Sequence, residues 1–497
     1  MSIKKELQQG ALVNFMGVAG KIAGPAFLVL VTRFYGPDLF GIFVTANLLI
    51  EISIAFLTAG FKDGSLIFVA RYADRKEDRP LLYRSLANAL AWSMGLASLL
   101  LILTITVVPA FLGQIYSGDF ANELIPLLLI MVFALPLMAF ERMTLSATQG
   151  LKIMKYEAMI SGWIRPIILL TFVISFYPFY PNIYGLGIAF IFTQICVVMI
   201  SIWVYNLELS WIELSRAFRD FKLNMELLKF SIPQNFNLTL TRFITGLDVL
   251  MLPAFGFSAA AVGFYAAGAM IVRELRNIKL MFSTAFAPFI VRLHRAGQLE
   301  ALSKNFSMSS NWVASIAIPA ILSIAILRND LLLLVHPDYT DSTMFMLFLL
   351  PVPFFYNSFG LAGNIVTMTG HSTITLMNST IVLITNFLLN LLFIPMYGLI
   401  GAALASAIAA CLLSILELTE ARYIVGVKLL LSRIFLPYLL GIVFTILLWL
   451  LQLRINFMGE DIMLRVGITL TMIAAFGGIL YGVHRAGLYR VKHIRDS

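Results

Sequence analysis

Long apolar stretches separated by short polar ones follow one another along this 497-residue chain. A helix needs about 20 apolar residues to cross the hydrocarbon core of a membrane. We count about fourteen stretches of that length, which predicts an all-α protein that crosses the membrane repeatedly. The predicted spans are residues 11–35, 41–69, 85–111, 122–148, 157–177, 184–206, 229–254, 260–290, 307–328, 342–367, 373–395, 398–418, 431–452 and 462–484.

The composition supports a membrane protein, since 60% of the residues are hydrophobic and 12% are charged. A water-soluble protein of that composition would have too little polar surface. The first span follows Lys4 and Lys5 and has no cleavage pattern, so we expect it to be retained as a helix. Cys196 and Cys411 lie in apolar stretches without a Cys/His cluster, so the sequence predicts no metal site and no cofactor.

The basic residues predict which side of the membrane each loop faces, because short cytoplasmic loops are enriched in Lys and Arg. If the N-terminus is cytoplasmic, the loops on the same side hold nearly all of the basic loop residues. These are Arg71, Arg75, Lys76, Arg79, Arg84, Lys152, Lys155, Arg216, Arg219, Lys222, Lys229, Arg292, Arg295, Lys304, Arg422, Lys428, Arg433, Arg485, Arg490, Lys492 and Arg495. Both termini are therefore predicted to be cytoplasmic. The net charge of +9 is then explained by topology and lipid headgroups, and nucleic acid is not an expected partner.

Four short motifs occur twice in the same order, roughly 220 residues apart. The pairs are residues 36–43 with 256–265, 119–120 with 338–339, 148–150 with 368–370, and 184–186 with 397–399. This order predicts an internal duplication. Each copy holds six spans, an even number, so the copies enter the membrane from the same side and are parallel. We therefore expect two six-helix lobes related by a pseudo-two-fold axis along the membrane normal, with two additional C-terminal helices.

The predicted domains follow from this duplication. They are an N-terminal lobe at 1–206, a cytoplasmic amphipathic linker at 207–228, a C-terminal lobe at 229–418, and two further spans with a basic tail at 419–497. In the linker, Trp211, Leu214 and Phe218 recur at helical spacing between basic residues. This pattern fits an interfacial helix on anionic lipid, and a solvated linker is the alternative.

The predicted loops are too short for an extramembrane catalytic domain, so function is expected inside the membrane. Charged residues within spans are costly and default to functional hypotheses. At about 1.5 Å per residue, Lys21, Arg242 and Arg273 lie near the middle of their spans. Arg165 lies at intermediate depth and Arg276 closer to the cytoplasm. These cations are the candidate anion-binding residues.

Other intramembrane charges have simpler explanations. Lys62, Arg142 and Lys279 lie close enough to the inner face to reach headgroups or to form structural pairs. Three carboxylates, those of Glu51, Asp248 and Glu274, are candidates either for structural counter-ions or for proton coupling. Proton or sodium coupling and the membrane potential all remain possible driving forces.

The first span is predicted to bend. Pro25 cannot donate a hydrogen bond to the carbonyl four residues earlier, that of Lys21, and Gly24 adds flexibility beside it. A hinge at Gly24 and Pro25 next to a midplane lysine would suit a moving gate. Close helix packing through small residues is the alternative.

Several motifs together resemble polysaccharide-type flippases of the multidrug/oligosaccharidyl-lipid/polysaccharide (MOP) exporter superfamily. They are residues 33–36, 40–43, 230–233, 248, 263–265, 394–398 and 401–403, and the resemblance runs over nearly the whole chain. It implies two six-helix lobes around a central cavity and two extra helices. It also implies transport of an undecaprenyl-diphosphate-linked oligosaccharide to the periplasmic leaflet of the bacterial inner membrane, not catalysis.

The family's use of basic cavity residues for the diphosphate and sugar carries over, by position, to Lys21, Arg242 and Arg273. A glycan polymerase and a chain-length regulator would be further partners, beside membrane lipids. One alternative is a cation-coupled drug exporter of the same superfamily, which would favour an anionic cavity. Others are a membrane-embedded glycosyltransferase or polymerase, which usually needs a sizeable external loop, and a scaffold that transports nothing.

Overall fold

Helices make up nearly all of the computed structural model, and no strand occurs in the residues it describes. Those residues are 23–73, 75–116, 118–339 and 343–429, with a few positions between 439 and 471. The last two predicted spans and Lys21 lie outside them. Contacts divide the chain into two units, Met1–Ala266 and Ala267–Ser497, which meet within helix α12 (Ala259–Glu274). The predicted domain boundaries, which lie on either side of residues 207–228, stay a prediction.

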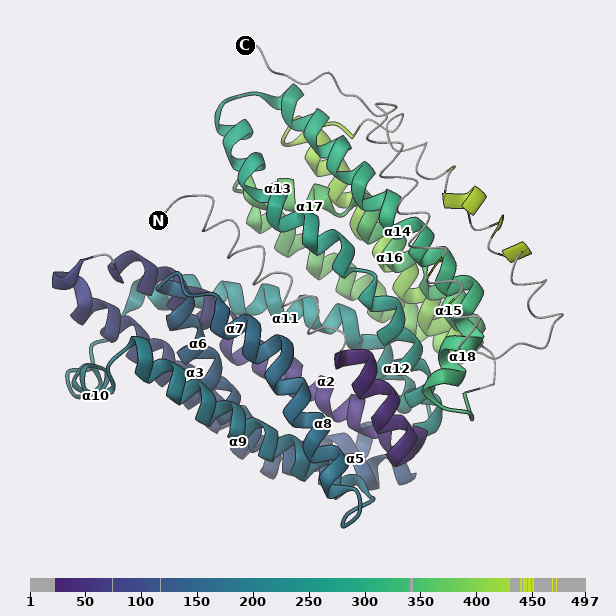
Figure 1. The fold of residues 1–497 in the computed structure, drawn as a ribbon, viewed down its shortest axis with the longest axis horizontal. Helices are drawn as coiled ribbons and strands as arrows, with labels where there is room; N and C mark the ends of the chain where they lie inside the picture. The colour runs from purple at the N-terminus through teal and green to yellow at the C-terminus, as the bar shows by residue number, and fades with distance from the viewer. Residues whose placement is uncertain are drawn as a thin grey trace. The chain divides into compact units, whose positions relative to one another are not determined.

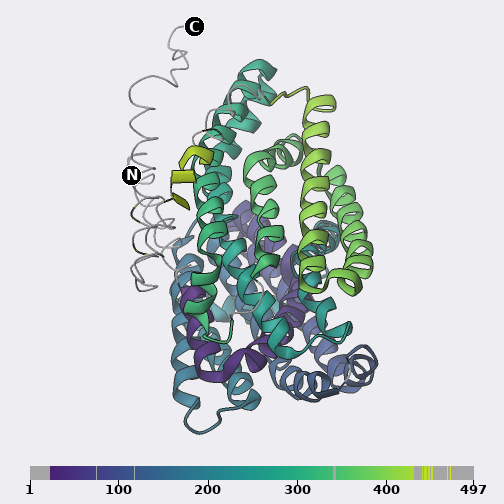
Figure 2. The ribbon, with the colours of Figure 1, turned by 90° about the vertical axis from the view of Figure 1, so that its right-hand side faces the viewer.

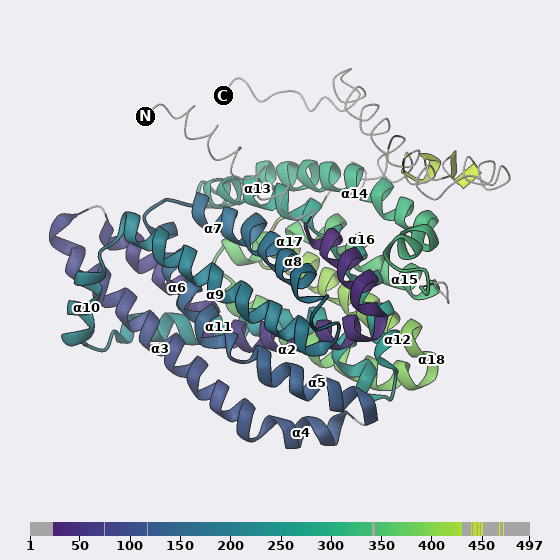
Figure 3. The same cartoon turned by 60° about the horizontal axis from the view of Figure 1, so that its bottom comes forward.

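Unit 1 is built around α2, which packs against α3, α5, α6, α8 and α11. Figure 1 shows α3, α6 and α9 side by side, in agreement with their contacts. Figure 3 shows how the short α4 connects α3 to α5. The elements are α2 (Ala23–Ala73), η1 (Lys76–Asp78), α3 (Arg79–Thr106), α4 (Val108–Ile115), α5 (Gly118–Met131), α6 (Ala134–Gly150), α7 (Lys155–Met159), η2 (Ile160–Ile164), α8 (Arg165–Phe176), α9 (Ile183–Glu208), α10 (Trp211–Arg219) and α11 (Met225–Ala254).

Unit 2 begins within α12 and ends, for the main described part, after α18. Its longest element reverses direction at Gly398, which has φ of 57°. Figure 2 shows the two segments of α18, green and yellow-green, running antiparallel beside each other. The remaining elements are α13 (Asn277–Arg295), α14 (Leu299–Val335), α15 (Met344–Leu349), α16 (Pro351–Phe359), α17 (Leu361–Met368) and α18 (Ser372–Tyr423).

Six helices of the described residues are long and apolar enough to cross a membrane, or up to eight if each bent pair forms one span. Two of the six lie within α2 and α18, and each overlaps two predicted spans. The helix continues on both sides of the kinks at Gly36 and Gly398, so two predicted spans fall within one helix. The bent pairs, α5 with α6 and α15–α16 with α17, fall on the fourth and tenth predicted spans. The expected all-helical, multi-pass architecture is confirmed, and the total of about fourteen spans fits this arrangement.

Two of the four pairs of duplicated motifs take similar local structures in the two copies. Gly36 and Gly256 both have a left-handed backbone, with φ of 84° and 82°. Such values strain any residue with a Cβ, so glycine is needed at both turns. Helix α6 ends at Gly150 and α17 ends just before Gly370. At these two pairs the repeat in the sequence corresponds to a repeat in the backbone.

Two of these duplicated glycines also meet. A Cβ on Gly41 would lie against the carbonyl oxygen of Ala259 and 2.7 Å from the nitrogen of Gly263. A Cβ on Gly263 would lie against the carbonyl oxygen of Pro37 and 3.1 Å from the nitrogen of Gly41. The surroundings of Gly41 and of Gly263 are therefore equivalent, as expected where two helices cross at a local two-fold axis. The absence of side chains at Gly41 and Gly263 is what lets α2 and α12 approach this closely.

Candidate functional site

Unit 1 gathers five charged side chains from four membrane helices. They come from Glu51 on α2, Glu141 and Arg142 on α6, Arg165 on α8 and Arg242 on α11, and we refer to them as the unit 1 charge cluster. The helices bring them together because α2 packs directly against α6, α8 and α11. Sequence analysis had placed Glu51, Arg165 and Arg242 among the candidate functional residues without predicting that they share one cluster.

Arg142 binds Glu51 across the contact between α2 and α6. Its guanidinium lies 3.3 Å from the Glu51 carboxylate and 3.4 Å from the hydroxyl of Thr58. The Thr58 hydroxyl donates its own hydrogen to the Ile54 carbonyl, so its oxygen is free to accept from Arg142. The side chains of Arg142 and Glu51 are 20% and 26% exposed. Each charge is thus balanced at a depth where an isolated one would be costly.

Glu141 is the most deeply buried member of the cluster, with a side chain only 2% exposed. Both of its oxygens accept hydrogen bonds from Arg165, and one accepts a third from the Gln194 amide at 2.9 Å. The carboxylate therefore links α6, α8 and α9. Arg165 follows a turn of π-helix at η2, a wide turn that is frequent at functional sites.

Sequence analysis did not single out Glu141. It is adjacent to Arg142, and successive residues of a helix point about 100° apart, so the two side chains reach different neighbours. The adjacent opposite charges within an apolar stretch were the available signal, since neither could lie in lipid without a partner.

Arg242 differs from the other two arginines of the cluster. Its side chain is exposed, and within the described part of the chain it forms no salt bridge. Its charge nevertheless acts on the carboxylate of Glu51, as do those of Arg142 and Arg165. The cluster holds three arginines against two glutamates, so it carries one surplus positive charge. Because of this surplus positive charge and the exposed side chain of Arg242, the cluster is suited to binding an anion.

Asp248 is another sequence candidate in unit 1, and it lies outside the unit 1 charge cluster. It is 2% exposed and accepts a hydrogen bond of 2.7 Å from the hydroxyl of Tyr265. It also accepts one of 2.9 Å from the backbone nitrogen of Val249. The bond from Tyr265 joins α11 to α12, two residues beyond Gly263.

Unit 2 carries the other predicted cations. Arg276 and Lys279 both lie over the ring of Tyr356, with the charged groups 4.4 and 4.2 Å from its centroid. Lys279 is only 6% exposed. Its charge also acts on Glu417, whose carboxylate lies against Gly363. Glu417 lies one residue beyond the charge-free stretch at 372–416, and sequence analysis did not consider it.

The eighth predicted span, residues 260–290, is broken rather than continuous. Helix α12 ends at Glu274 and α13 begins at Asn277. The buried amide of Asn357 donates to the carbonyl of Leu275 and accepts from the backbone nitrogen of Lys279, both at 3.0 Å. A side chain from α16 therefore satisfies the backbone groups that the break exposes. Arg273 and Glu274 lie just before it, and Glu274 accepts a bond of 2.6 Å from Asn277.

The remaining sequence candidates lie at the edge of the described residues. Gly24 and Pro25 fall in the first turn of α2, so the hinge proposed there stays a prediction. The break that the structure does show in α2 is at Gly36. Among the residues searched, no group of three or more His, Cys, Asp or Glu side chains is arranged to hold a metal ion.

Several solved structures share this fold. The lipid II flippase MurJ in an inward closed conformation has a TM-score of 0.72 and 15% identity, covering 97% of this chain and all of that one. An inward-facing multidrug resistance MATE transporter of the MOP superfamily has a TM-score of 0.67 and 14% identity, covering 82% and 94%. The MATE multidrug transporter DinF-BH has a TM-score of 0.63 and 16% identity, covering 86% and 98%. The fold is that of MOP-superfamily transporters.

The sequence itself gives the family. The family model described as polysaccharide biosynthesis protein matches residues 7–294, more than half of the chain, and the chain belongs to this family. The search of curated proteins gave no match. The family resemblance identified in the sequence is confirmed, and the protein is a multi-pass membrane protein of this family.

Proposed function

We propose that the protein flips an undecaprenyl-diphosphate-linked oligosaccharide across the bacterial inner membrane, from the cytoplasmic to the periplasmic leaflet. The observation that carries this is the surplus positive charge of the unit 1 charge cluster with an exposed Arg242, which suits a diphosphate and disfavours a cationic drug. The polysaccharide biosynthesis family supports a saccharide precursor. The proposed mechanism is alternating access, with both termini cytoplasmic.

The proposed diphosphate ligands are Lys21, Arg242 and Arg273, with Arg165 and Arg276 as supporting cations. Arg165 would act through a guanidinium that Glu141 already orients. Outward movement of an anion is favoured by an inside-negative membrane potential, by about 2.3 kcal/mol per charge per 100 mV. A glycan polymerase and a chain-length regulator would act on the product in the outer leaflet.

Flipping by the full chain in proteoliposomes tests the proposal. The substrate is a fluorescent undecaprenyl-diphosphate oligosaccharide, and its appearance on the outer face of the vesicles is measured by its cleavage by an added glycosidase. We expect Arg242→Ala to weaken substrate binding about tenfold to a hundredfold, since a hydrogen bond to a charged group contributes about 1.5–3 kcal/mol. Arg71→Ala is the matched control, because Arg71 forms an exposed pair with Glu226 at 2.8 Å, lies over the ring of Phe68 and is not part of the unit 1 charge cluster.

Two results would contradict the proposal. One is an Arg242→Ala protein that flips the glycolipid at the rate of the unchanged protein. The other is a chain that leaves the glycolipid in place and exports cationic drugs from the same vesicles, which would favour the drug-exporter alternative.

A further inference from the structure

The segment that joins α9 to α11 is fixed to unit 1 at both of its ends. At its start, the backbone nitrogen of Ser210 donates to the hydroxyl of Tyr83 at 3.0 Å. At its end, Asn88 donates to the carbonyl of Lys222 at 2.8 Å and accepts from the nitrogen of Asn224 at 3.0 Å. We define residues 210–225 as the linker segment. The linker segment is therefore attached to unit 1 at both ends.

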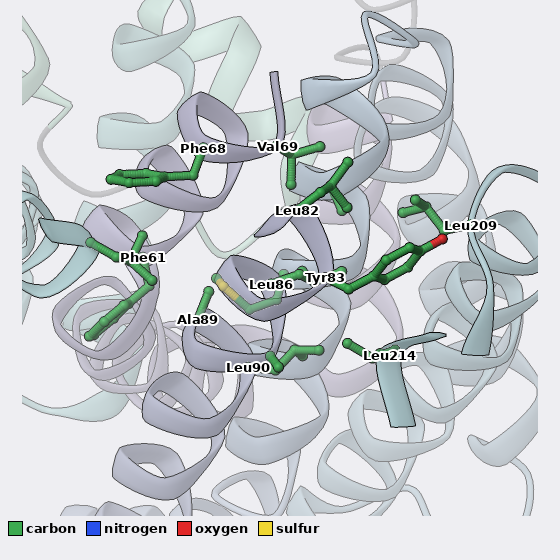
Figure 4. Close-up of a cluster of buried hydrophobic side chains, with 14 of the residues drawn as sticks. Phe61, Phe68, Val69, Leu82, Tyr83, Leu86, Ala89, Leu90, Leu209 and Leu214 are labelled. Carbon is green, nitrogen blue, oxygen red and sulfur yellow. The ribbon is translucent and has the colours of Figure 1, made fainter. Parts of the chain in front are cut away.

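One face of α10, the helix in this segment, is used for the attachment. The indole of Trp211 stacks on the ring of Phe140, with centroids 6.1 Å apart and planes 6° apart, and contacts Tyr205 at 4.2 Å. Leu214 is 3% exposed and belongs to the hydrophobic cluster drawn in Figure 4. The sequence had suggested that Trp211 and Leu214 contact lipid. The structure corrects this, because the two side chains cover protein.

The linker segment still exposes large apolar side chains that the attachment does not use. Ile212, Phe218, Phe221 and Leu223 are 65%, 42%, 42% and 50% exposed. Four such residues within twelve positions expose more apolar area than is usual for a surface facing only water, and we refer to these four side chains as the apolar patch.

Basic residues alternate with this patch. Arg216 is paired with Glu213 at 2.6 Å, whereas Arg219 and Lys222 form no salt bridge with any residue that the structure describes. Exposed apolar side chains interleaved with unpaired cations are the composition of helices that lie in a membrane interface.

The position of the linker segment indicates that lipid is its partner. It begins two residues after α9, a candidate membrane span at Ile183–Glu208, and it is bonded to α3, another candidate span at Arg79–Thr106. A segment held at the ends of two such helices lies at the level of the lipid headgroups. We infer that residues 212–223 form a second, lipid-recognising surface, on which Ile212, Phe218, Phe221 and Leu223 enter the headgroup region while Arg219 and Lys222 bind anionic lipid phosphates.

This surface is independent of the proposed transport substrate, and its test needs no transport assay. The full chain, with Cys196 and Cys411 replaced by alanine, receives one nitroxide at Ile212→Cys or Phe221→Cys. It is reconstituted in phosphatidylcholine vesicles with or without phosphatidylglycerol. Collisions with oxygen report lipid, and collisions with a water-soluble nickel chelate report water. Leu103→Cys on α3, an exposed apolar position, and Glu77→Cys, in the loop after α2, give the lipid and water references.

In anionic vesicles we expect both linker labels to resemble the Leu103 label, with the ratio of oxygen to nickel collisions several-fold above that at Glu77. In neutral vesicles, and in anionic vesicles after Arg219→Gln with Lys222→Gln, the ratio should fall toward the Glu77 value. Linker labels with the same collision ratio as the Glu77 label in both kinds of vesicle would overturn the proposal that this surface enters the headgroup region. Equal insertion with and without anionic lipid would overturn the role of the cations. Protection from both reagents would mean that protein covers the patch.

Discussion

Adding one methyl group at Gly41 tests whether the reciprocal crossing of α2 and α12 sets how closely unit 1 is packed. In Gly41→Ala the new Cβ would lie 2.7 Å from the nitrogen of Gly263 and closer still to the carbonyl of Ala259. Ordinary van der Waals contact begins at 3.4 Å. Both obstructing atoms belong to the backbone and cannot rotate away, so the two helices must separate.

The expected loss of stability follows from two opposing terms. Overpacking costs typically about 1–3 kcal/mol, whereas replacing glycine by alanine within a helix gains about 0.5–1 kcal/mol. The two terms leave a net destabilisation of about 0–2.5 kcal/mol, and because the obstructing atoms are backbone we expect the upper part of that range. Gly263→Ala should cost a similar amount, because its contacts with Pro37 and Gly41 mirror those of Gly41. The double variant should cost less than the sum, since helices already separated accept the second methyl group.

Gly95→Ala and Gly113→Ala are the matched controls. Both glycines lie in helices of unit 1, α3 and α4, and a Cβ on either would meet nothing within 4 Å. The controls should keep or slightly raise stability. The assay is thermal unfolding of the purified full chain in one detergent, followed by intrinsic fluorescence. A Gly41→Ala protein that melts at the same temperature as Gly95→Ala would refute the reasoning.

Two further predictions concern buried polar contacts of unit 1. Glu141→Leu leaves Arg165 without its counter-charge and should lower the free energy of unfolding by about 3–5 kcal/mol. Glu141→Leu with Arg165→Met should lower it clearly less. Equal melting temperatures for the single and double variants would show that the pair is not coupled. Tyr265→Phe removes the hydroxyl that donates to the Asp248 carboxylate and should cost about 1.5–3 kcal/mol. Asp248→Asn with Tyr265→Phe provides the comparison, and an unchanged melting temperature for Tyr265→Phe alone would argue against this bond.

The sequence by itself determined the class of protein, the positions of most helices and the internal repeat. Apolar length is a property of a short stretch of chain, so the spans could be counted without knowing what packs against them. The turns at Gly36 and Gly256 could be located for a similar reason. A left-handed backbone depends on a single residue, and glycine adopts it without strain.

The charge pairs could not be predicted in this way. Helices that are apolar on all sides carry no stripe that tells which face points inward, so the rotation of each helix is set by its neighbours. The sequence named both Arg165 and Arg242 as candidate anion-binding residues without showing which of them is paired. Only the packed helices distinguish a guanidinium held by Glu141 from an exposed one that is left to bind an anion.

The same reason explains the two elements whose surroundings the sequence misjudged. No proline or glycine marks the break after Glu274, because the amide of Asn357, about eighty residues away in the chain, supplies the missing hydrogen bonds. The apolar face of α10 was visible as a pattern, but a pattern does not say whether lipid or protein covers it. Spacing along the chain decides which side chains share a face, and tertiary contacts decide what that face meets.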